Sequence, residues 1–128
     1  MALTKGIHHI AIKAYGDEEY KKIVAFYRDV LGMPVYKDWK TGIMLDTGGG
    51  SRMEIMNNAE SRLPQGTLRH VAFETDDVDA CIAAVRNAGY QVTIEPADVV
   101  IAAEKPYPLR MAFCIGPAGE EIEFFTEL

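Results

Sequence analysis

The chain has 128 residues, a length typical of one domain with a real core. Its formal net charge of -6 argues against a nucleic-acid partner, because such proteins need clustered Lys and Arg to release counterions from phosphates. No run of residues is apolar and long enough to span a membrane, and the N-terminus lacks the pattern of a secretory signal. We therefore expect a cytoplasmic protein with a small-molecule partner, and we expect Cys81 and Cys114 to be core thiols.

The first half of the chain predicts a strand, a helix and three further strands. The apolar segment 7–12 is followed by a helical pattern over 17–31, in which Asp17 is a suitable N-cap and Gly32 a suitable C-terminal glycine. Short β-type segments follow at residues 34–39, 42–46 and 51–57. The glycine-rich stretch 47–51 lacks the Gly-Lys-Ser/Thr ending of a phosphate-binding loop and predicts a hairpin turn.

The second half repeats this order, which is the signature of a duplicated architecture. Residues 68–73 (Leu-Arg-His-Val-Ala-Phe) match residues 7–12 (Ile-His-His-Ile-Ala-Ile) in the pattern apolar-x-His-apolar-Ala-apolar. Asp76 or Asp77 caps a second helix, and β-type segments follow at residues 91–95, 109–115 and 121–126. Residues 96–108 contain three prolines and predict a loop over the site in place of a central strand.

The repeat also predicts which side chains share a face, because side chains alternate between the two faces of a strand. His9 and His70 each point away from the apolar residues that alternate with them. In the closing strand of each half, Glu54 and Glu123 likewise stand between two apolar neighbours and point away from the core. We therefore expect these four polar side chains to line one concave surface.

Two imidazoles and two carboxylates make a mixed ligand set suited to one divalent ion of Zn, Ni, Co, Mn or Fe. An ordinary hydrogen bond explains a lone strand histidine more simply. A His and a Glu recur at matching positions in both halves, so this explanation would have to hold by coincidence in each half. The repeat therefore favours a metal bound by His9, Glu54, His70 and Glu123. His8 competes with His9 for this role, but it does not match the position of His70.

The chain, from about His8 to Glu127, resembles the vicinal-oxygen-chelate superfamily of glyoxalases, bleomycin-resistance proteins and dioxygenases. Besides His-His-Ile-Ala-Ile at the start, three segments carry the resemblance. They are Phe-Tyr-Arg-Asp-Val-Leu-Gly-Met at 26–33, Arg-His-Val-Ala-Phe-Glu at 69–74 and Gly-Pro-Ala-Gly-Glu-Glu-Ile-Glu at 116–123.

The resemblance implies an α+β fold, in which two β-α-β-β-β modules form a curved sheet around a metal and substrate cavity. The modules would cover about residues 6–58 and 67–127 of a single domain over residues 1–128. It also implies a homodimer, which would cover the sheet edges and apolar surface that so small a chain leaves open.

The ligand order His, Glu, His, Glu is most similar to that of glyoxalase I, the lactoylglutathione lyase. The resemblance implies a metal-dependent lyase or isomerase that transfers a proton within an oxoaldehyde–thiol adduct through an enediolate. Glu123 is the first choice for the base, and Glu54 is the second catalytic carboxylate. Asn58 matches a substrate-binding Asn, whereas Lys13 replaces an Arg that holds a glutathione carboxylate, which points away from glutathione as the thiol.

Two alternatives stay open. A non-enzymatic protein would sequester a drug-like molecule, as bleomycin-resistance proteins do, although strand aromatics more often belong to the core. The aromatic residues available for such a pocket are Tyr36, Trp39, Tyr107 and Phe125. A dioxygenase that uses iron and O₂ fits less well, because such sites use two His and one carboxylate.

Arg110 and Tyr107 are further candidates for binding an anionic substrate.

Overall fold

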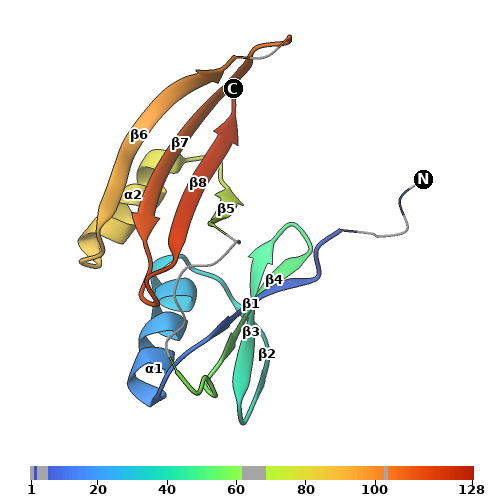
Figure 1. The fold of residues 1–128 in the computed structure, drawn as a ribbon, viewed down its shortest axis with the longest axis vertical. Helices are drawn as coiled ribbons and strands as arrows, with labels where there is room; N and C mark the ends of the chain where they lie inside the picture. The colour runs from blue at the N-terminus through green and yellow to red at the C-terminus, as the bar shows by residue number, and fades with distance from the viewer. Residues whose placement is uncertain (1, 3–5, 62–68, 103) are drawn as a thin grey trace. The chain divides into compact units, whose positions relative to one another are not determined.

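The computed structural model describes residues 2, 6–61, 69–102 and 104–128 (Figure 1). The chain divides into two compact units, residues 1–63 (unit 1) and 64–128 (unit 2). Within the described residues, each unit is a four-stranded mixed sheet with a helix against one face. This order, β-α-β-β-β in each unit, confirms the predicted α+β fold class.

Unit 1 has the strand order β1-β4-β3-β2, with β1 parallel to β4 and the other pairs antiparallel. Its elements are β1 (His9–Lys13), α1 (Asp17–Ala25), the π-helical turn η1 (Phe26–Val30), β2 (Val35–Trp39), β3 (Gly42–Gly48) and β4 (Ser51–Met56). The predicted helix over 17–31 thus changes its hydrogen bonding midway, since the Leu31 N–H bonds to the Phe26 carbonyl. Its N-cap is Gly16, one residue before the predicted Asp17.

Unit 2 has the strand order β5-β8-β7-β6, with β5 parallel to β8. Its elements are β5 (Val71–Glu74), α2 (Val78–Asn87), β6 (Val92–Ile101), β7 (Tyr107–Ile115) and β8 (Glu121–Glu127). Asp77 caps α2, because its carboxylate accepts a hydrogen bond from the Ala80 N–H at 2.9 Å. The topology of the two units is therefore the same, as the internal repeat predicts.

The prediction of a loop over residues 96–108 is wrong. β6 continues to Ile101 and β7 begins at Tyr107, so the two strands form a long antiparallel pair. β6 lies at the edge of its sheet, and Pro96 lies in the register shift between Ile94 and Ala97. Proline is tolerated at an edge strand and at a bulge because no ladder hydrogen bond is required from it there.

Each helix buries apolar side chains against its own sheet. The fully buried side chains of unit 1 include Ile23, Phe26, Tyr27, Leu45, Met53 and Ile55, and those of unit 2 include Val78, Ile82, Val85, Cys114, Ile122 and Phe124. Both cysteines are free thiols, Cys114 in the core and Cys81 half-buried. The core occupies the helix side, and the other face of each sheet carries polar side chains such as Glu54 and Glu123 beside apolar ones such as Met44 and Phe113.

No helix in the described part of the chain is both long and apolar enough to cross a membrane.

Candidate functional site

The register of the parallel strands in each unit brings a histidine and a glutamate to the same face. Ala11 pairs with Glu54 across β1 and β4, and Ala72 pairs with Glu123 across β5 and β8. Each histidine lies two residues before its alanine, so alternation places it on the face of the glutamate. The same strand register therefore brings a histidine and a glutamate together in both units.

The two pairs have similar geometry. His9 Nε2 lies 3.6 Å from Glu54 Oε1, and His70 Nε2 lies 3.2 Å from Glu123 Oε1. The glutamate side chains are 15% and 12% exposed, whereas the histidine side chains are 39% and 38% exposed. Each pair thus combines a shielded carboxylate with an accessible imidazole.

Burial changes the acidity of one of these glutamates. Desolvation raises the pKa of Glu123, and the nearby Glu121 raises it further, while contact with His70 lowers it only in part. The net effect is a raised pKa, so this carboxylate accepts a proton more readily than an exposed one.

The two histidine rings are held by different neighbours. The Nδ1 atom of His9 lies 2.9 Å from the Nδ1 atom of His8. The ring of His70 instead packs edge-on against Phe113, with the ring centroids 5.3 Å apart. In both cases the Nε2 atom faces the glutamate of the same unit.

The donor atoms fit a divalent metal in type and in spacing. Two ligands that each bind one ion at about 2.1 Å lie roughly 3.0 to 3.4 Å apart, which is close to the two separations found here. A typical site needs three or four protein ligands, however. Among residues 6–61, 69–102 and 104–128, no group of three or more His, Cys, Asp or Glu side chains meets. Each unit by itself therefore offers two ligands of a suitable kind.

The structure places the two predicted substrate-binding residues in unit 1. Lys13 is exposed at the end of β1 and alternates onto the face of His9. Asn58 is exposed just after β4, the strand of Glu54. The neighbouring Asn57 donates a hydrogen bond from Nδ2 to the Lys40 carbonyl at 3.2 Å, which ties its side chain to the β2–β3 turn.

Arg110 and Tyr107 are engaged within unit 2, so the structure does not support an anion-binding role for them. Arg110 donates two hydrogen bonds to Asp79 on α2, both at 2.8 Å, and one to Asp98 on β6 at 2.9 Å. These contacts raise the pKa of Arg110 and lower that of Asp79. The hydroxyl of Tyr107 donates to the carboxylate of Glu127, which raises the pKa of Tyr107.

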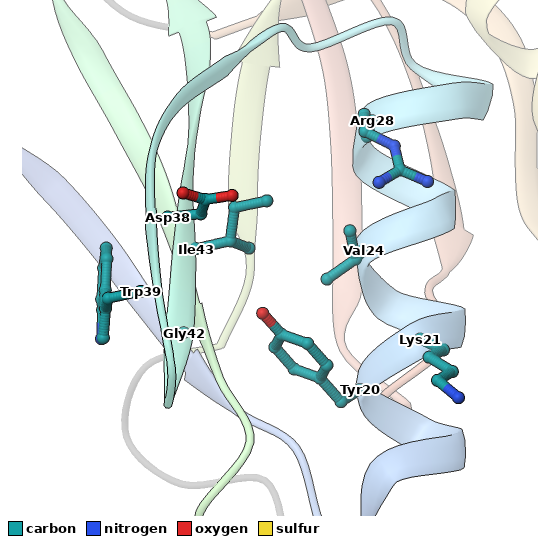
Figure 2. A pocket seen from close by; sticks show the side chains of 8 residues that line it. All are labelled: Tyr20, Lys21, Val24, Arg28, Asp38, Trp39, Gly42 and Ile43. Carbon is teal, nitrogen blue, oxygen red and sulfur yellow. The ribbon is translucent and has the colours of Figure 1, made fainter.

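A pocket of about 290 Å³ lies in unit 1 between α1 and the strands β2 and β3 (Figure 2). Its lining residues are Tyr20, Lys21, Val24, Arg28, Asp38, Trp39, Gly42 and Ile43. The Tyr20 hydroxyl points from the helix towards the strands, while the Lys21 side chain points away (Figure 2). Ile43 pairs with the buried Ile55, so the pocket lies on the helix side of the sheet, opposite Glu54.

Only one of the four aromatic residues predicted for a drug pocket, Trp39, lines this cavity. Tyr20 and Asp38 were not expected there, because nothing in their spacing sets them apart from other residues of an amphipathic helix and an edge strand. The cavity depends on how the helix lies over the hairpin, which local sequence does not specify.

Comparison with known proteins identifies the family. Residues 6–124 match the sequence model of the Glyoxalase/Bleomycin resistance protein/Dioxygenase superfamily. The chain belongs to this superfamily. The resemblance to vicinal-oxygen-chelate proteins is thereby confirmed, and it covers nearly the whole chain.

Individual members of this superfamily and proteins with this fold differ in function. The uncharacterised YaeR protein of Escherichia coli (strain K12) is 31% identical over 136 residues, 96% of this chain and 97% of YaeR. The metallothiol transferase FosB of Staphylococcus epidermidis is 30% identical over 81 residues, 60% of this chain and 54% of FosB. The antibiotic-binding protein TnmS3 of Streptomyces sp. CB03234 shares the fold, with a TM-score of 0.70 and 20% identity over all of both chains.

Proposed function

We propose that this protein is a metal-dependent lyase or isomerase of the glyoxalase I type, which acts on a small oxoaldehyde–thiol adduct. The observation that carries the proposal is the repeated pair of a histidine and a glutamate. The same strand register sets these groups 3.6 Å apart in one unit and 3.2 Å apart in the other. Both pairs are polar and lie on the sheet face opposite the buried core, so packing of the core does not account for them.

We further propose that His9, Glu54, His70 and Glu123 together hold one divalent ion of Zn, Ni, Co, Mn or Fe. Neither pair alone offers enough ligands, whereas the two pairs offer four. When bound, such an ion polarises the carbonyl oxygen of a substrate as a Lewis acid. The FosB relative supports this proposal, since its name, metallothiol transferase, refers both to a metal and to a thiol.

Glu123 is the proposed general base, and Glu54 is the second carboxylate that exchanges the proton. The raised pKa of Glu123 suits it to accept a proton from a carbon next to a carbonyl, because base strength increases with pKa. The shielded position of its side chain keeps water away from the transferred proton. The proton removed by Glu123 would pass to Glu54, in the other pair, which delivers it to the adjacent carbon.

Lys13 and Asn58 are the proposed contacts for the thiol part of the substrate. Each lies on or directly after a strand that carries a proposed ligand, β1 for Lys13 and β4 for Asn58. Lysine binds a carboxylate as a point charge, without the two-pronged geometry of arginine. We therefore propose a low-molecular-weight thiol other than glutathione.

The test is an assay with the metal controlled. Protein purified without chelator is analysed for bound elements, stripped, and reloaded with each candidate ion in turn. Hemithioacetals made from methylglyoxal and several thiols, glutathione among them, then serve as substrates. We expect chelation to abolish turnover and one ion to restore it. Metal-loaded protein that isomerises none of these adducts would refute the substrate class.

A second candidate, binding of a small molecule without turnover, is favoured by the pocket beside Trp39 and by the fold shared with TnmS3. Trp39 is the single tryptophan of the sequence, so its fluorescence reports directly on this cavity. Saturable quenching by an aromatic drug-like compound, in protein that shows no turnover with any metal, would favour this candidate over the lyase.

We also propose a homodimer. Two of the edge strands, β2 and β6, each carry several exposed apolar side chains. These side chains are Val35, Tyr36 and Trp39 on β2 and Ile94, Val100 and Ile101 on β6. Exposed edges and apolar patches are commonly covered by a partner. Light scattering is expected to give about twice the chain mass of 14.2 kDa. A monomer mass that does not change with concentration would contradict the dimer.

A further inference from the structure

We infer that His8 is a positioning residue for the metal ligand His9, whose ring it holds through a hydrogen bond between the two Nδ1 atoms. This inference rests on the proposed function, since it concerns one of the proposed ligands. It assigns a role to a histidine that the internal repeat leaves without a counterpart, because the matching position before His70 is Arg69.

The contact uses one side of the His9 ring and leaves the other side to the proposed metal site. The Nδ1 atoms of His8 and His9 lie 2.9 Å apart, and the two rings are nearly perpendicular, at 87°. The Nε2 atom of His9 instead faces Glu54. Nδ1 of His9 is thus used in the hydrogen bond with His8, and Nε2 lies on the side of the proposed metal.

Metal binding at Nε2 of His9 requires one particular arrangement of protons. Two neutral imidazoles that meet at Nδ1 need one donor and one acceptor. If His9 accepted, its own proton would sit on Nε2, and that nitrogen would have no lone pair to offer a metal. If His9 donates, Nε2 has a free lone pair, as a metal ligand requires. Ligating histidines generally donate their second N–H to a partner that fixes the tautomer and the ring orientation.

His8 is itself held in place by the sheet that carries the ligands. Its carbonyl accepts a hydrogen bond from the Arg52 N–H on β4 at 3.0 Å, so the backbone before β1 is tied to the strand of Glu54. In unit 2 the edge-on contact with Phe113 holds the ring of His70. The two proposed imidazole ligands are therefore oriented by different means, a hydrogen bond in one unit and an aromatic contact in the other.

Two substitutions of His8 distinguish the effect of its hydrogen-bond acceptor from the effect of the size of its ring. His8→Phe keeps the ring but removes the acceptor, whereas the Oδ1 atom introduced by His8→Asn lies close to where Nδ1 was and still accepts. With Zn²⁺ alone as the probe, competition against a chromophoric chelator is expected to show affinity about 10- to 100-fold weaker for His8→Phe. His8→Asn is expected to keep the wild-type affinity. Should His8→Phe unfold the protein, as judged by thermal denaturation, His8→Leu also removes the acceptor and takes its place in the test.

A second readout does not depend on the metal. Nitrogen-15 NMR of the metal-free chain is expected to show His9 protonated at Nδ1 in the wild type and in His8→Asn, and a shift towards Nε2 protonation in His8→Phe. Wild-type Zn²⁺ binding that His8→Phe leaves unchanged would overturn the inference and leave the proposed metal site standing. Absence of Zn²⁺ binding by the wild type would refute the metal site. In that case, protonation of wild-type His9 at Nε2 would overturn the inference and protonation at Nδ1 would support it.

Discussion

Glu123→Gln is expected to lower kcat/KM for the hemithioacetal by about 100- to 10,000-fold, the usual contribution of a positioned general base. Glutamine keeps the size of the side chain but has no oxygen basic enough to take the proton. Metal content is measured on the same samples, because Glu123 is also a proposed ligand. The matched control is Glu127→Gln, which removes a carboxylate that lies on the same strand and does not shift the pKa of Glu123, and it is expected to leave the rate close to that of the wild type. Equal losses in both variants would refute the assignment of the base.

The thermal stability of metal-free Glu123→Gln tests whether a loss of rate comes from unfolding, and we expect that it does not. Burial raises the pKa of Glu123 in the folded state, so the ionised form is disfavoured on folding. The stability linked to this group is fully present below the pKa of the unfolded chain and is lost as pH rises through the folded pKa. Glutamine does not ionise, so the variant should unfold at a temperature no lower than the wild type at pH 7. The two midpoints should converge below about pH 4, where an unfolded glutamate is protonated.

Phe124→Ala, one residue further along β8, is expected to reduce the free energy of unfolding by about 3 to 5 kcal/mol. Phe124 is 2% exposed, and its ring lies 6.4 Å from that of Phe73 on the paired strand. Truncation would remove a large apolar surface and leave a cavity. Urea unfolding followed by circular dichroism measures the loss, since it reports on both units.

The matched control for this change is Phe125→Ala, on the opposite face of the same strand. Phe125 is only partly buried, and its ring meets Tyr107 edge-on at 6.2 Å. Its truncation should therefore cost clearly less than that of Phe124. Equal losses would contradict the assignment of the two faces of β8.

Several features of the fold and site could be predicted because they depend on neighbours in the chain. Alternation along a strand is local, so the outward facing of Glu54 followed from the buried Met53 and Ile55 on either side of it. The cap of α2 at Asp77 is likewise a contact within one helical turn. The internal repeat then extended each local pattern to the other half.

Other features could not be predicted because they join distant parts of the chain. Residues 96–108 resemble a loop in composition, yet a strand at the edge of a sheet accepts Pro96 at a bulge. Whether a strand is an edge depends on which partners pair with it. Arginine is a residue type that often binds anions, which made Arg110 a candidate. In the structure Asp79 on α2 and Asp98 on β6 form ion pairs with Arg110 and neutralise its charge.

The sequence by itself determined the duplicated β-α-β-β-β order, the family, and the faces of the strands that carry His9, Glu54, His70 and Glu123, because each rests on periodicity or on a motif. Only the tertiary structure decided that each histidine meets a glutamate of its own unit and that His8 Nδ1 meets His9 Nδ1. Strand register and ring orientation set these distances. Both arise from the pairing of segments far apart in the chain and from the packing around them, which no local pattern encodes.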